Sequence, residues 1–339
     1  MRAAVLGTGL IGTSVAIGLR LAGWRVAGWD PDPTALDGAV SLQALDSRTA
    51  GPDEAVMGAD LVVAAGPAEA VVDLLGGLET DALVTDVAGV KTPVVAAGAR
   101  LPHFVGGHPM AGRETSGPIG ASGSLFRGAL WILTVDGAGS GDLERMRGIV
   151  TSLGATPVEM TAEEHDATVA LISHLPHVVA AALTSRIAGH SGALDLAGGG
   201  FRDLTRVALS EPGWWSDVLI GNREAVASAL RRLAGDLTGW AERVESADRP
   251  AIVGALEESR RVRASMSAPV AAVSVVLEDQ PGEIARVGHA LSVASVDLRD
   301  LQLRHASHGG GGVLTLSVRA GEVTRLREAL SGEGFRVLG

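Results

Sequence analysis

The sequence predicts three successive domains: an α/β domain with a parallel sheet, an all-helical domain and a small α+β domain. The first is indicated by short apolar runs that alternate with alanine-rich helical stretches as far as about residue 154. The second is indicated by two long segments, 162–188 and 222–247, in which Ala, Leu and Val recur every three or four residues. After residue 268 the patterns are strand, helix, strand, strand, helix, strand, which predicts a βαββαβ unit. We therefore place the domains at residues 1–155, 156–267 and 268–339.

Composition and charge favour a small-molecule partner. The net charge of −11 would repel nucleic acid and anionic lipid, because both bind clusters of basic residues. The chain has no cysteine, which excludes disulfides, thiolate catalysis and cysteine metal sites and makes a reducing cytoplasm the expected setting. We expect no uncharged apolar run to approach the roughly 20 residues of a membrane-spanning helix. The sequence thus predicts a soluble cytoplasmic protein with no nucleic-acid and no membrane partner.

A glycine-rich stretch near the start of the chain predicts a dinucleotide site. It follows an apolar run and opens a helix, which is the setting that the G-x-G-x-x-G pattern requires. Gly7 permits a tight turn, Gly9 lets backbone N–H groups approach a pyrophosphate, and Gly12 allows the helix to pack closely on the strand. The alternative is that these glycines only serve packing in a Gly- and Ala-rich chain. The stretch reads Gly7-Thr8-Gly9-Leu10-Ile11-Gly12.

Asp30, at the end of the second predicted strand, indicates which dinucleotide is bound. Its carboxylate can accept hydrogen bonds from the ribose hydroxyls and would repel a 2′-phosphate. The sequence therefore predicts NAD in preference to NADP. A plain turn residue before Pro31 is the competing interpretation.

The long apolar helices of the second domain need a partner surface. Helices of this kind pack against each other or against a second subunit more often than against water. We expect a homodimer that forms through this region.

Three further segments carry distinctive motifs, and with the glycine-rich stretch they resemble the prephenate dehydrogenase family. The resemblance covers nearly the whole chain and implies a Rossmann domain, a helical dimerisation domain and an ACT-like regulatory domain with residues 279–282 as its loop. The most specific element is the G-G-H-P-M-A-G-x-E stretch. The segments are Asp86-Val87-Ala88-Gly89-Val90-Lys91, residues 106–117 and residues 198–206.

The resemblance implies an NAD-dependent oxidative decarboxylation of a cyclohexadiene dicarboxylate. Hydride leaves C4, the ring loses CO2 and becomes aromatic, so that prephenate gives 4-hydroxyphenylpyruvate in tyrosine biosynthesis. His108 matches the family's catalytic base, which receives the proton of the C4 hydroxyl. A neutral histidine suits that transfer, and hydride leaves more readily from an alkoxide-like carbon. A purely structural histidine is the alternative.

The resemblance also implies a set of substrate residues. Arg206 matches the arginine that binds a substrate carboxylate, and a guanidinium fork suits bidentate binding, although a surface role is common for arginine. Asp203 could orient Arg206 or His108, or form an ordinary i,i+3 pair. Glu114 matches a catalytic-site position of the family. The residues that match the lining of the substrate pocket are His174, His177 and Trp215.

Two other features complete the predicted site. We place Asp86 and Lys91, which form the D-x-x-x-x-K motif with the only lysine of the chain, among the cofactor-binding residues. The i,i+3 spacing of His174 and His177 could suit a metal, but no third ligand set accompanies them, and we expect none.

Gly89 departs from the family pattern. The family usually has a serine there, whose hydroxyl lies near the catalytic histidine and the substrate's C4 hydroxyl. Loss of such a hydroxyl can slow the reaction by roughly one or two orders of magnitude. A glycine would leave room for the amine of 4-amino-4-deoxyprephenate, which is therefore an alternative substrate, and arogenate is a third.

Two other classes of function compete with this interpretation. A non-catalytic sensor of NAD and an amino acid would bind both without turnover, and His108, Glu114 and Arg206 together argue against it. A β-hydroxyacid dehydrogenase would need a catalytic lysine in the helical domain, and none follows Lys91.

The ACT-like segment predicts feedback inhibition by an aromatic amino acid, through coupling between its binding site and the active site. Deletion of residues 270–339 should abolish that inhibition, measured as the rate of NADH formation with and without the amino acid. Inhibition that survives the deletion would refute the regulatory assignment.

Overall fold

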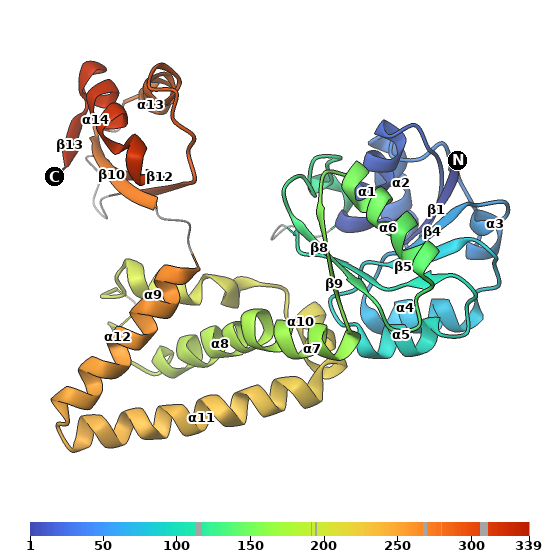
Figure 1. Ribbon diagram of the computed structural model, residues 1–339, viewed down its shortest axis with the longest axis horizontal. Helices are drawn as coiled ribbons and strands as arrows, with labels where there is room; N and C mark the ends of the chain where they lie inside the picture. The colour runs from blue at the N-terminus through green and yellow to red at the C-terminus, as the bar shows by residue number, and fades with distance from the viewer. Residues whose placement is uncertain are drawn as a thin grey trace. The chain divides into compact units, whose positions relative to one another are not determined.

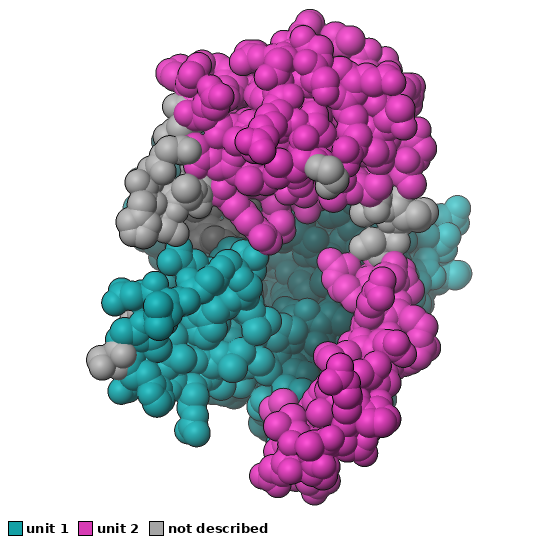
Figure 2. All heavy atoms as spheres, turned by 90° about the vertical axis from the view of Figure 1, so that its left-hand side faces the viewer, with its two compact units in different colours: residues 1–235 teal, residues 236–339 magenta. Residues whose placement is uncertain are grey.

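The computed structural model describes residues 1–339 except 113–116, 191, 194, 267–269, 279, 306–310 and 339. Contacts divide the chain into two compact units, Met1–Gly235 and Asp236–Gly339 (Figure 2). The division falls within the long helix α11 (Arg223–Glu245), so the second unit holds the end of the helical region as well as the small α+β sheet. The three domain boundaries predicted from the sequence stay a prediction.

A six-stranded parallel sheet forms the centre of the first unit (Figure 1). The strand order is β3-β2-β1-β4-β5-β6, and every neighbouring pair is parallel, which confirms the predicted α/β domain. The order reverses between β1 and β4, and ligands of such sheets bind beyond the carboxyl ends of the strands at that point. The strands are β1 (Arg2–Leu6), β2 (Arg25–Trp29), β3 (Ser47–Arg48), β4 (Leu61–Ala64), β5 (Leu83–Asp86) and β6 (Phe104–Val105).

Helices cover both faces of this sheet, because successive residues of its strands enter two different cores. Ala3 and Val5 of β1 belong to one hydrophobic cluster, whereas Ala4 and Leu6 belong to the other. This alternation, with apolar residues at every position, is typical of a parallel sheet buried on both faces. The helices are α1 (Leu10–Leu21), α2 (Pro33–Ser41), α3 (Pro52–Val56), α4 (Ala68–Gly77), α5 (Thr92–Gly98) and α6 (Ser140–Ser152).

A second, three-stranded sheet continues the first unit and carries His108. It has the order β7-β8-β9, with β7 antiparallel and β9 parallel to β8. His108 lies on β7, which begins two residues after the last strand of the large sheet ends. The elements are β7 (Gly107–Pro109), the 3-10 turn η1 (Pro118–Gly120), β8 (Leu130–Thr134) and β9 (Thr156–Met160).

The described residues of the region that follows form helices joined by turns, with no strand, as predicted. Its first helix, α7, passes through a π-helical turn, η2, into α8 without a break. Pro176 has no N–H to donate to the carbonyl of residue 172, and the helix widens just there. The elements are α7 (Ala162–Val169), η2 (Ala170–His174), α8 (Leu175–Ile187), α9 (Gly199–Thr205), η3 (Arg206–Leu209), α10 (Pro212–Gly221), α11 and α12 (Arg249–Ser265).

The continuous helix Ala162–Ile187 is, among the described residues, the one helix that is long and apolar enough to cross a membrane. The expectation that no such run exists is therefore wrong for this segment. Only 22% of its most apolar window is buried. The same helix carries Asp166 and three buried histidines, which are described below. An apolar outer face of this kind also suits a helix that packs against a second subunit.

The C-terminal sheet confirms the predicted βαββαβ order. Its four antiparallel strands have the order β11-β12-β10-β13, and both helices pack on the core that the sheet forms. Alternate residues of β10 and β12, such as Val273, Val275, Leu314 and Leu316, are fully buried. The elements are β10 (Val270–Leu277), α13 (Glu283–Val293), β11 (Asp300–His305), β12 (Gly312–Arg319), the 3-10 turn η4 (Ala320–Glu322), α14 (Val323–Gly332) and β13 (Arg336–Leu338).

The loop that precedes α13 is the one that the sequence assigns to regulation. Asp279 lies outside the described residues, and Gly282 has the left-handed φ of 93° that favours glycine. The buried carboxylate of Glu283 accepts hydrogen bonds from the backbone N–H groups of Glu278 and Gln280, at 3.0 and 3.1 Å. An effector carboxylate that used these two donors would have to displace Glu283.

Candidate active site

The glycine-rich turn between β1 and α1 has the shape that a dinucleotide requires. A Cβ atom at Gly7, whose φ is 103°, would lie 1.7 Å from the carbonyl oxygen of Ala65, and one at Gly12 would lie 2.0 Å from the carbonyl oxygen of Gly7. Both positions therefore admit only glycine. No atom lies within 4 Å of the corresponding point at Gly9, so the backbone there borders open space at the start of a helix. That arrangement fits a pyrophosphate.

Asp30 connects the glycine-rich turn to the end of β2 through hydrogen bonds. One carboxylate oxygen accepts hydrogen bonds from the backbone N–H and the hydroxyl of Thr8, and the other accepts one from the backbone N–H of Asp32 at 2.9 Å. Asp30 is thus held beside the glycine turn, at the carboxyl end of its strand. This is the position from which an acid reaches the hydroxyls of a ribose.

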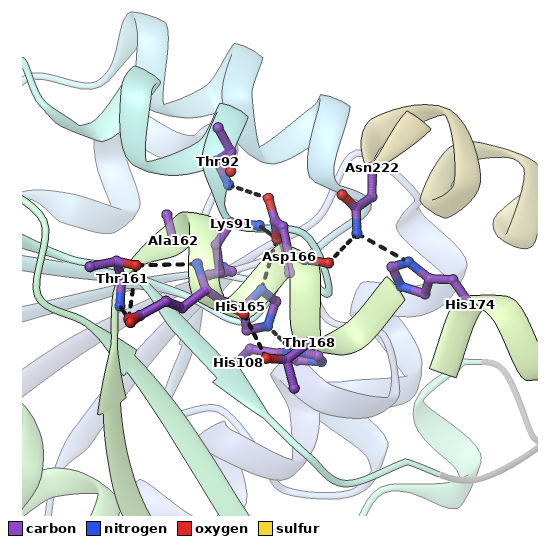
Figure 3. A network of polar contacts seen from close by, with 12 residues as sticks. Lys91, Thr92, His108, Thr161, Ala162, His165, Asp166, Thr168, His174 and Asn222 are labelled. Carbon is purple, nitrogen blue, oxygen red and sulfur yellow. Dashed lines mark hydrogen bonds and ion pairs between the residues drawn. The ribbon is translucent and has the colours of Figure 1, made fainter. Parts of the chain in front are cut away.

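Three side chains form a hydrogen-bonded chain that ends at His108 (Figure 3). Nδ1 of His108 lies 2.8 Å from Nε2 of His165, and Nδ1 of His165 lies 2.8 Å from a carboxylate oxygen of Asp166. His165 is fully buried, whereas His108 keeps a partly exposed edge. A histidine whose inner nitrogen is held in this way presents its other nitrogen, Nε2, to a ligand.

The start of α7 places His165 and Asp166 on the inner side of the helix. Thr161 and Glu164 form a capping box, in which each side chain accepts a hydrogen bond from the other residue's backbone N–H. The helix therefore begins at Ala162, and Asp166 meets the N-terminus of α5. Its two oxygens accept the backbone N–H groups of Lys91 and Thr92, at 2.7 and 2.8 Å.

These contacts fix the charge states of Asp166 and His108. Burial would raise the pKa of Asp166, but the hydrogen bonds from His165, Thr92 and Lys91 outweigh it and lower the pKa below its usual value. Asp166 is consequently ionised near neutral pH. Burial lowers the pKa of His108 well below 6.5, and the neighbouring ring of His165 adds to the effect. His108 is therefore uncharged near neutral pH and can accept a proton.

Asp86 and Lys91 are fully buried and form an ion pair with each other. Lys91 Nζ also donates to the carbonyl oxygen of Gly107 at 2.7 Å, and Asp86 accepts from the backbone N–H of Gly107 at 3.0 Å. The pair thus ties the end of β5 to β7, next to His108. The sequence placed these two residues in contact with the cofactor, but neither side chain has any exposed surface to offer a ligand. Burial lowers the pKa of Lys91, and the charge of Asp86 opposes that shift.

Gly89 lies against His108, where the family pattern has a serine. A Cβ at this position would lie 3.7 Å from Nε2 and 3.8 Å from Cε1 of His108, which is ordinary contact distance. A small side chain therefore fits here without displacing any neighbour. The glycine leaves open space on the side of the ring that carries Nε2.

The remaining histidines of the helical region lie around the same network. Asn222, which precedes α11, donates from Nδ2 to the carbonyl oxygen of Asp166 at 2.8 Å, and the same nitrogen lies 3.2 Å from Nδ1 of His174. Because the first contact identifies Nδ2 as a donor, Nδ1 of His174 accepts and its Nε2 carries the proton. Burial lowers the pKa of His174 to about 4, although Asp166 opposes that shift.

Trp215 stacks on His177, and both residues are predicted to line the substrate pocket. The two ring centroids are 3.7 Å apart and the planes differ by 12°. His177 is buried, and its Nδ1 has no hydrogen-bond partner among the described residues. The Trp215 ring also lies edge-on to His174, so that three predicted pocket residues, His174, His177 and Trp215, lie together.

Two predicted residues lie on the surface, and one lies outside the described residues. Asp203 and Arg206, near the junction of α9 and η3, are exposed, and their assignment to the substrate stays a prediction. The sequence allowed Asp203 to orient His108, but the group that binds Nδ1 of His108 is His165. Glu114 falls in the segment 113–116, which the structure leaves undescribed.

The sequence analysis missed three residues of this network: His165, Asp166 and Asn222. The available signal was an acidic residue and three histidines in a largely apolar helical segment, residues 165–177. Buried polar groups of this kind need partners, and their clustering at one end of the helix marks a site.

The chain is similar to known proteins over most of its length. A family model described as the prephenate dehydrogenase nucleotide-binding domain matches residues 15–159, and one described as the prephenate dehydrogenase dimerization domain matches residues 161–258. The Bacillus subtilis prephenate dehydrogenase is 30% identical over 93% of this chain and 91% of its own length. The probable prephenate dehydrogenase NovF of Streptomyces niveus is 31% identical over 97% of both chains.

Solved structures show the same similarity. The Synechocystis arogenate dehydrogenase has a TM-score of 0.70 and 30% identity, and covers 79% of this chain and 100% of its own. The A. aeolicus prephenate dehydrogenase, in complex with hydroxyphenyl propionate and NAD+, has a TM-score of 0.73 and 29% identity, and covers 79% of this chain and 98% of its own.

The lowered pKa of His174 predicts a loss of stability in mild acid. The folded state keeps His174 neutral down to about pH 4, whereas the unfolded chain binds its proton near pH 6.5. The contribution is therefore complete above about pH 6.5 and is lost as the pH falls towards 4, by up to about 3 kcal/mol. Urea denaturation at pH 7.5 and pH 4.5 measures the difference.

A matched pair of variants assigns this effect. His174→Gln should reduce the loss between the two pH values, and His190→Gln, which replaces an exposed histidine, should leave it unchanged. An equal loss in wild type and His174→Gln would contradict the assignment.

Proposed function

The chain belongs to the prephenate dehydrogenase family, and we propose that it converts prephenate and NAD to 4-hydroxyphenylpyruvate, CO2 and NADH in tyrosine biosynthesis. The observation that carries this proposal is the uncharged His108, whose Nε2 faces the open space beside Gly89. A proton acceptor in that position is what the oxidation of an alcohol carbon requires. The similarity to prephenate dehydrogenases over most of the chain supports the choice of substrate.

The residues of the glycine turn fit NAD. Gly9 leaves the backbone open to a pyrophosphate at the N-terminus of α1, and Asp30 offers its carboxylate to the ribose. A 2′-phosphate at the same place would meet the negative charge of Asp30, which favours NAD over NADP. When bound, NAD supplies the acceptor for the hydride that leaves C4 of the substrate.

His108 acts on the C4 hydroxyl. Its Nε2 takes the hydroxyl proton, and the O–H electron pair becomes the second bond between C4 and oxygen as hydride leaves. The bond from C1 to its carboxylate then breaks and CO2 departs. Its electron pair shifts into the ring, the π pair of the C4–oxygen double bond returns to the oxygen, and that oxygen takes a proton back from Nε2 of His108 to give the phenol. Transfer to a positioned base of this kind contributes about 10²- to 10⁴-fold to the rate.

A substrate with two carboxylates needs donors near His108. His174 presents an N–H at Nε2, and Trp215 and His177 form a flat stacked surface beside it. A guanidinium such as that of Arg206 can bind a carboxylate through two hydrogen bonds. We assign Arg206, Asp203, His177 and Trp215 to the substrate on the family resemblance, and Glu114 to the catalytic site on the same basis.

We propose that the chain forms a homodimer through the helical region and that it acts in the cytoplasm. The region matches a dimerization domain, and its longest apolar helix exposes Leu171 and Ile172 at 49% and 59% of their surface. Exposed side chains of this size on a helix are typical of a subunit interface. Sedimentation velocity would show twice the chain mass of 34.4 kDa, and a species of that single mass would contradict the assignment.

The second candidate substrate is 4-amino-4-deoxyprephenate, and the open space at Gly89 favours it. The position has room for a serine, and the glycine removes a hydroxyl that would hydrogen-bond near the C4 substituent. An amine brings its own donors to this space. Arogenate is a third candidate, since the Synechocystis arogenate dehydrogenase is as similar as the prephenate dehydrogenases.

The first prediction from this proposal concerns activity and its base. Purified enzyme with NAD and prephenate should form NADH, measured by absorbance, and should form little with NADP. His108→Asn should lower kcat by about 10²- to 10⁴-fold, because the base is removed. The exposed-residue variant His190→Gln is the control and should keep the wild-type rate. Absence of NADH from prephenate, its 4-amino analogue and arogenate alike would refute the proposal.

The second prediction concerns Gly89. Gly89→Ser should raise kcat/KM for prephenate relative to 4-amino-4-deoxyprephenate by about 10-fold or more, because the restored hydroxyl can bind the C4 hydroxyl and His108. The ratio of the two kcat/KM values, measured for wild type and variant, gives the answer. An unchanged ratio would show that Gly89 does not determine the choice between the two substrates.

A further inference from the structure

The two hydrogen bonds that link Asp166, His165 and His108 have a fixed donor-to-acceptor direction. Asp166 sets that direction. Asp166 receives the backbone N–H groups of Lys91 and Thr92, so its carboxylate is ionised and acts only as an acceptor. The ring atom of His165 that faces it, Nδ1, must therefore donate. With a single ring proton, His165 then accepts at Nε2.

The same argument extends one residue further. Nε2 of His165 faces Nδ1 of His108 at 2.8 Å, so that Nδ1 of His108 must carry the proton. A neutral imidazole with its proton on Nδ1 has its lone pair on Nε2. Nε2 is the atom beside Gly89, where a Cβ would lie 3.7 Å away. The carboxylate of Asp166 thus determines the tautomer of the His108 ring.

We propose that His165 and Asp166 are positioning residues that hold His108 in the tautomer with its lone pair on Nε2 and share the charge that His108 gains. When a substrate proton arrives at Nε2, the proton on Nδ1 of His108 moves towards Nε2 of His165. His165 then carries both ring protons, and its Nδ1–H remains bonded to ionised Asp166. One proton enters the chain and none leaves it, so the charge of the three residues rises by one unit.

This inference rests on the proposed function only for the identity of the proton donor. The direction of the hydrogen bonds is a property of the free enzyme and follows from its own atoms. Burial makes that direction important, because His165 is fully buried and an isolated imidazolium there would be costly. Asp166 supplies the countercharge.

His165 is the residue to change, because Asp166 also caps α5 through Lys91 and Thr92. His165→Phe keeps an aromatic ring of similar size and removes both hydrogen bonds. His165→Gln keeps the direction of the bonds, since its amide can donate to Asp166 and accept from His108, but it cannot carry the proton. Circular dichroism and thermal melting establish that each full-length variant is folded.

The primary readout is the tautomer of His108, measured by ¹⁵N NMR on enzyme labelled at histidine, with His108→Asn used to assign the signals. Wild type should show the proton on Nδ1 and the lone pair on Nε2. His165→Gln should keep this pattern, and His165→Phe should lose it. A wild-type proton on Nε2 would overturn the proposal, as would a His165→Gln variant with its His108 proton on Nε2.

Kinetics provide the second readout. His165→Phe should lower kcat by about 10²-fold or more while KM changes by less than about 3-fold, because substrate binding is retained and the base is in the wrong form. His165→Gln should recover at least about 10-fold of that loss. A folded His165→Phe variant with wild-type kcat would overturn the proposal. Since the NMR experiment uses no substrate, a failure of the proposed function would leave the tautomer measurement decisive.

Discussion

The carboxylate of Asp166 is the constraint on which the rest of the site depends. It lies on the first turns of a helix that follows the α/β domain in sequence, and it binds the N-terminus of α5 within that domain. One of its oxygens also accepts from His165, and its backbone carbonyl accepts from Asn222, so that a single residue connects the start of α5, the histidine pair His165–His108 and His174. A buried anion is tolerated only with several donors of this kind. The site is therefore assembled by the junction of two structural regions and belongs to neither alone.

The buried ion pair of Asp86 and Lys91 supports the other side of His108. It connects the end of β5 with the backbone of Gly107, the residue that precedes His108 in the chain. A lysine with no exposed surface can be replaced only by a group that binds the same two acceptors, and arginine is larger and shaped differently. This explains why the one lysine of an arginine-rich chain occurs here. Its contribution is to the position of the strand that carries His108.

The sequence was sufficient for features whose cause is local. The glycine turn was predictable because the spacing of Gly7, Gly9 and Gly12 is characteristic and because Gly12 packs against the carbonyl of Gly7, its near neighbour in sequence. The three regions followed from the periodicity of apolar residues. Lys91 was recognised as unusual, but its burial depends on strands that the pattern does not join. His165, Asp166 and Asn222 were missed because their partners are far apart in sequence, with Asp166 75 residues from Lys91. Hydrogen bonds between residues so far apart in the sequence produce no recognisable spacing pattern.

The π-helical turn between α7 and α8 has a consequence for the phase of the helix. Side chains advance by about 100° per residue in an α-helix, so that a residue eight positions beyond Asp166 would be turned about 80° away from it. A π turn accommodates one extra residue without advancing the helix by that angle. His174 thereby occupies the direction that residue 173 would have, and it faces the same interior as Asp166, where Asn222 joins the two. The turn works as a one-residue register shift, which lets a single uninterrupted helix supply polar side chains to one site from both of its halves.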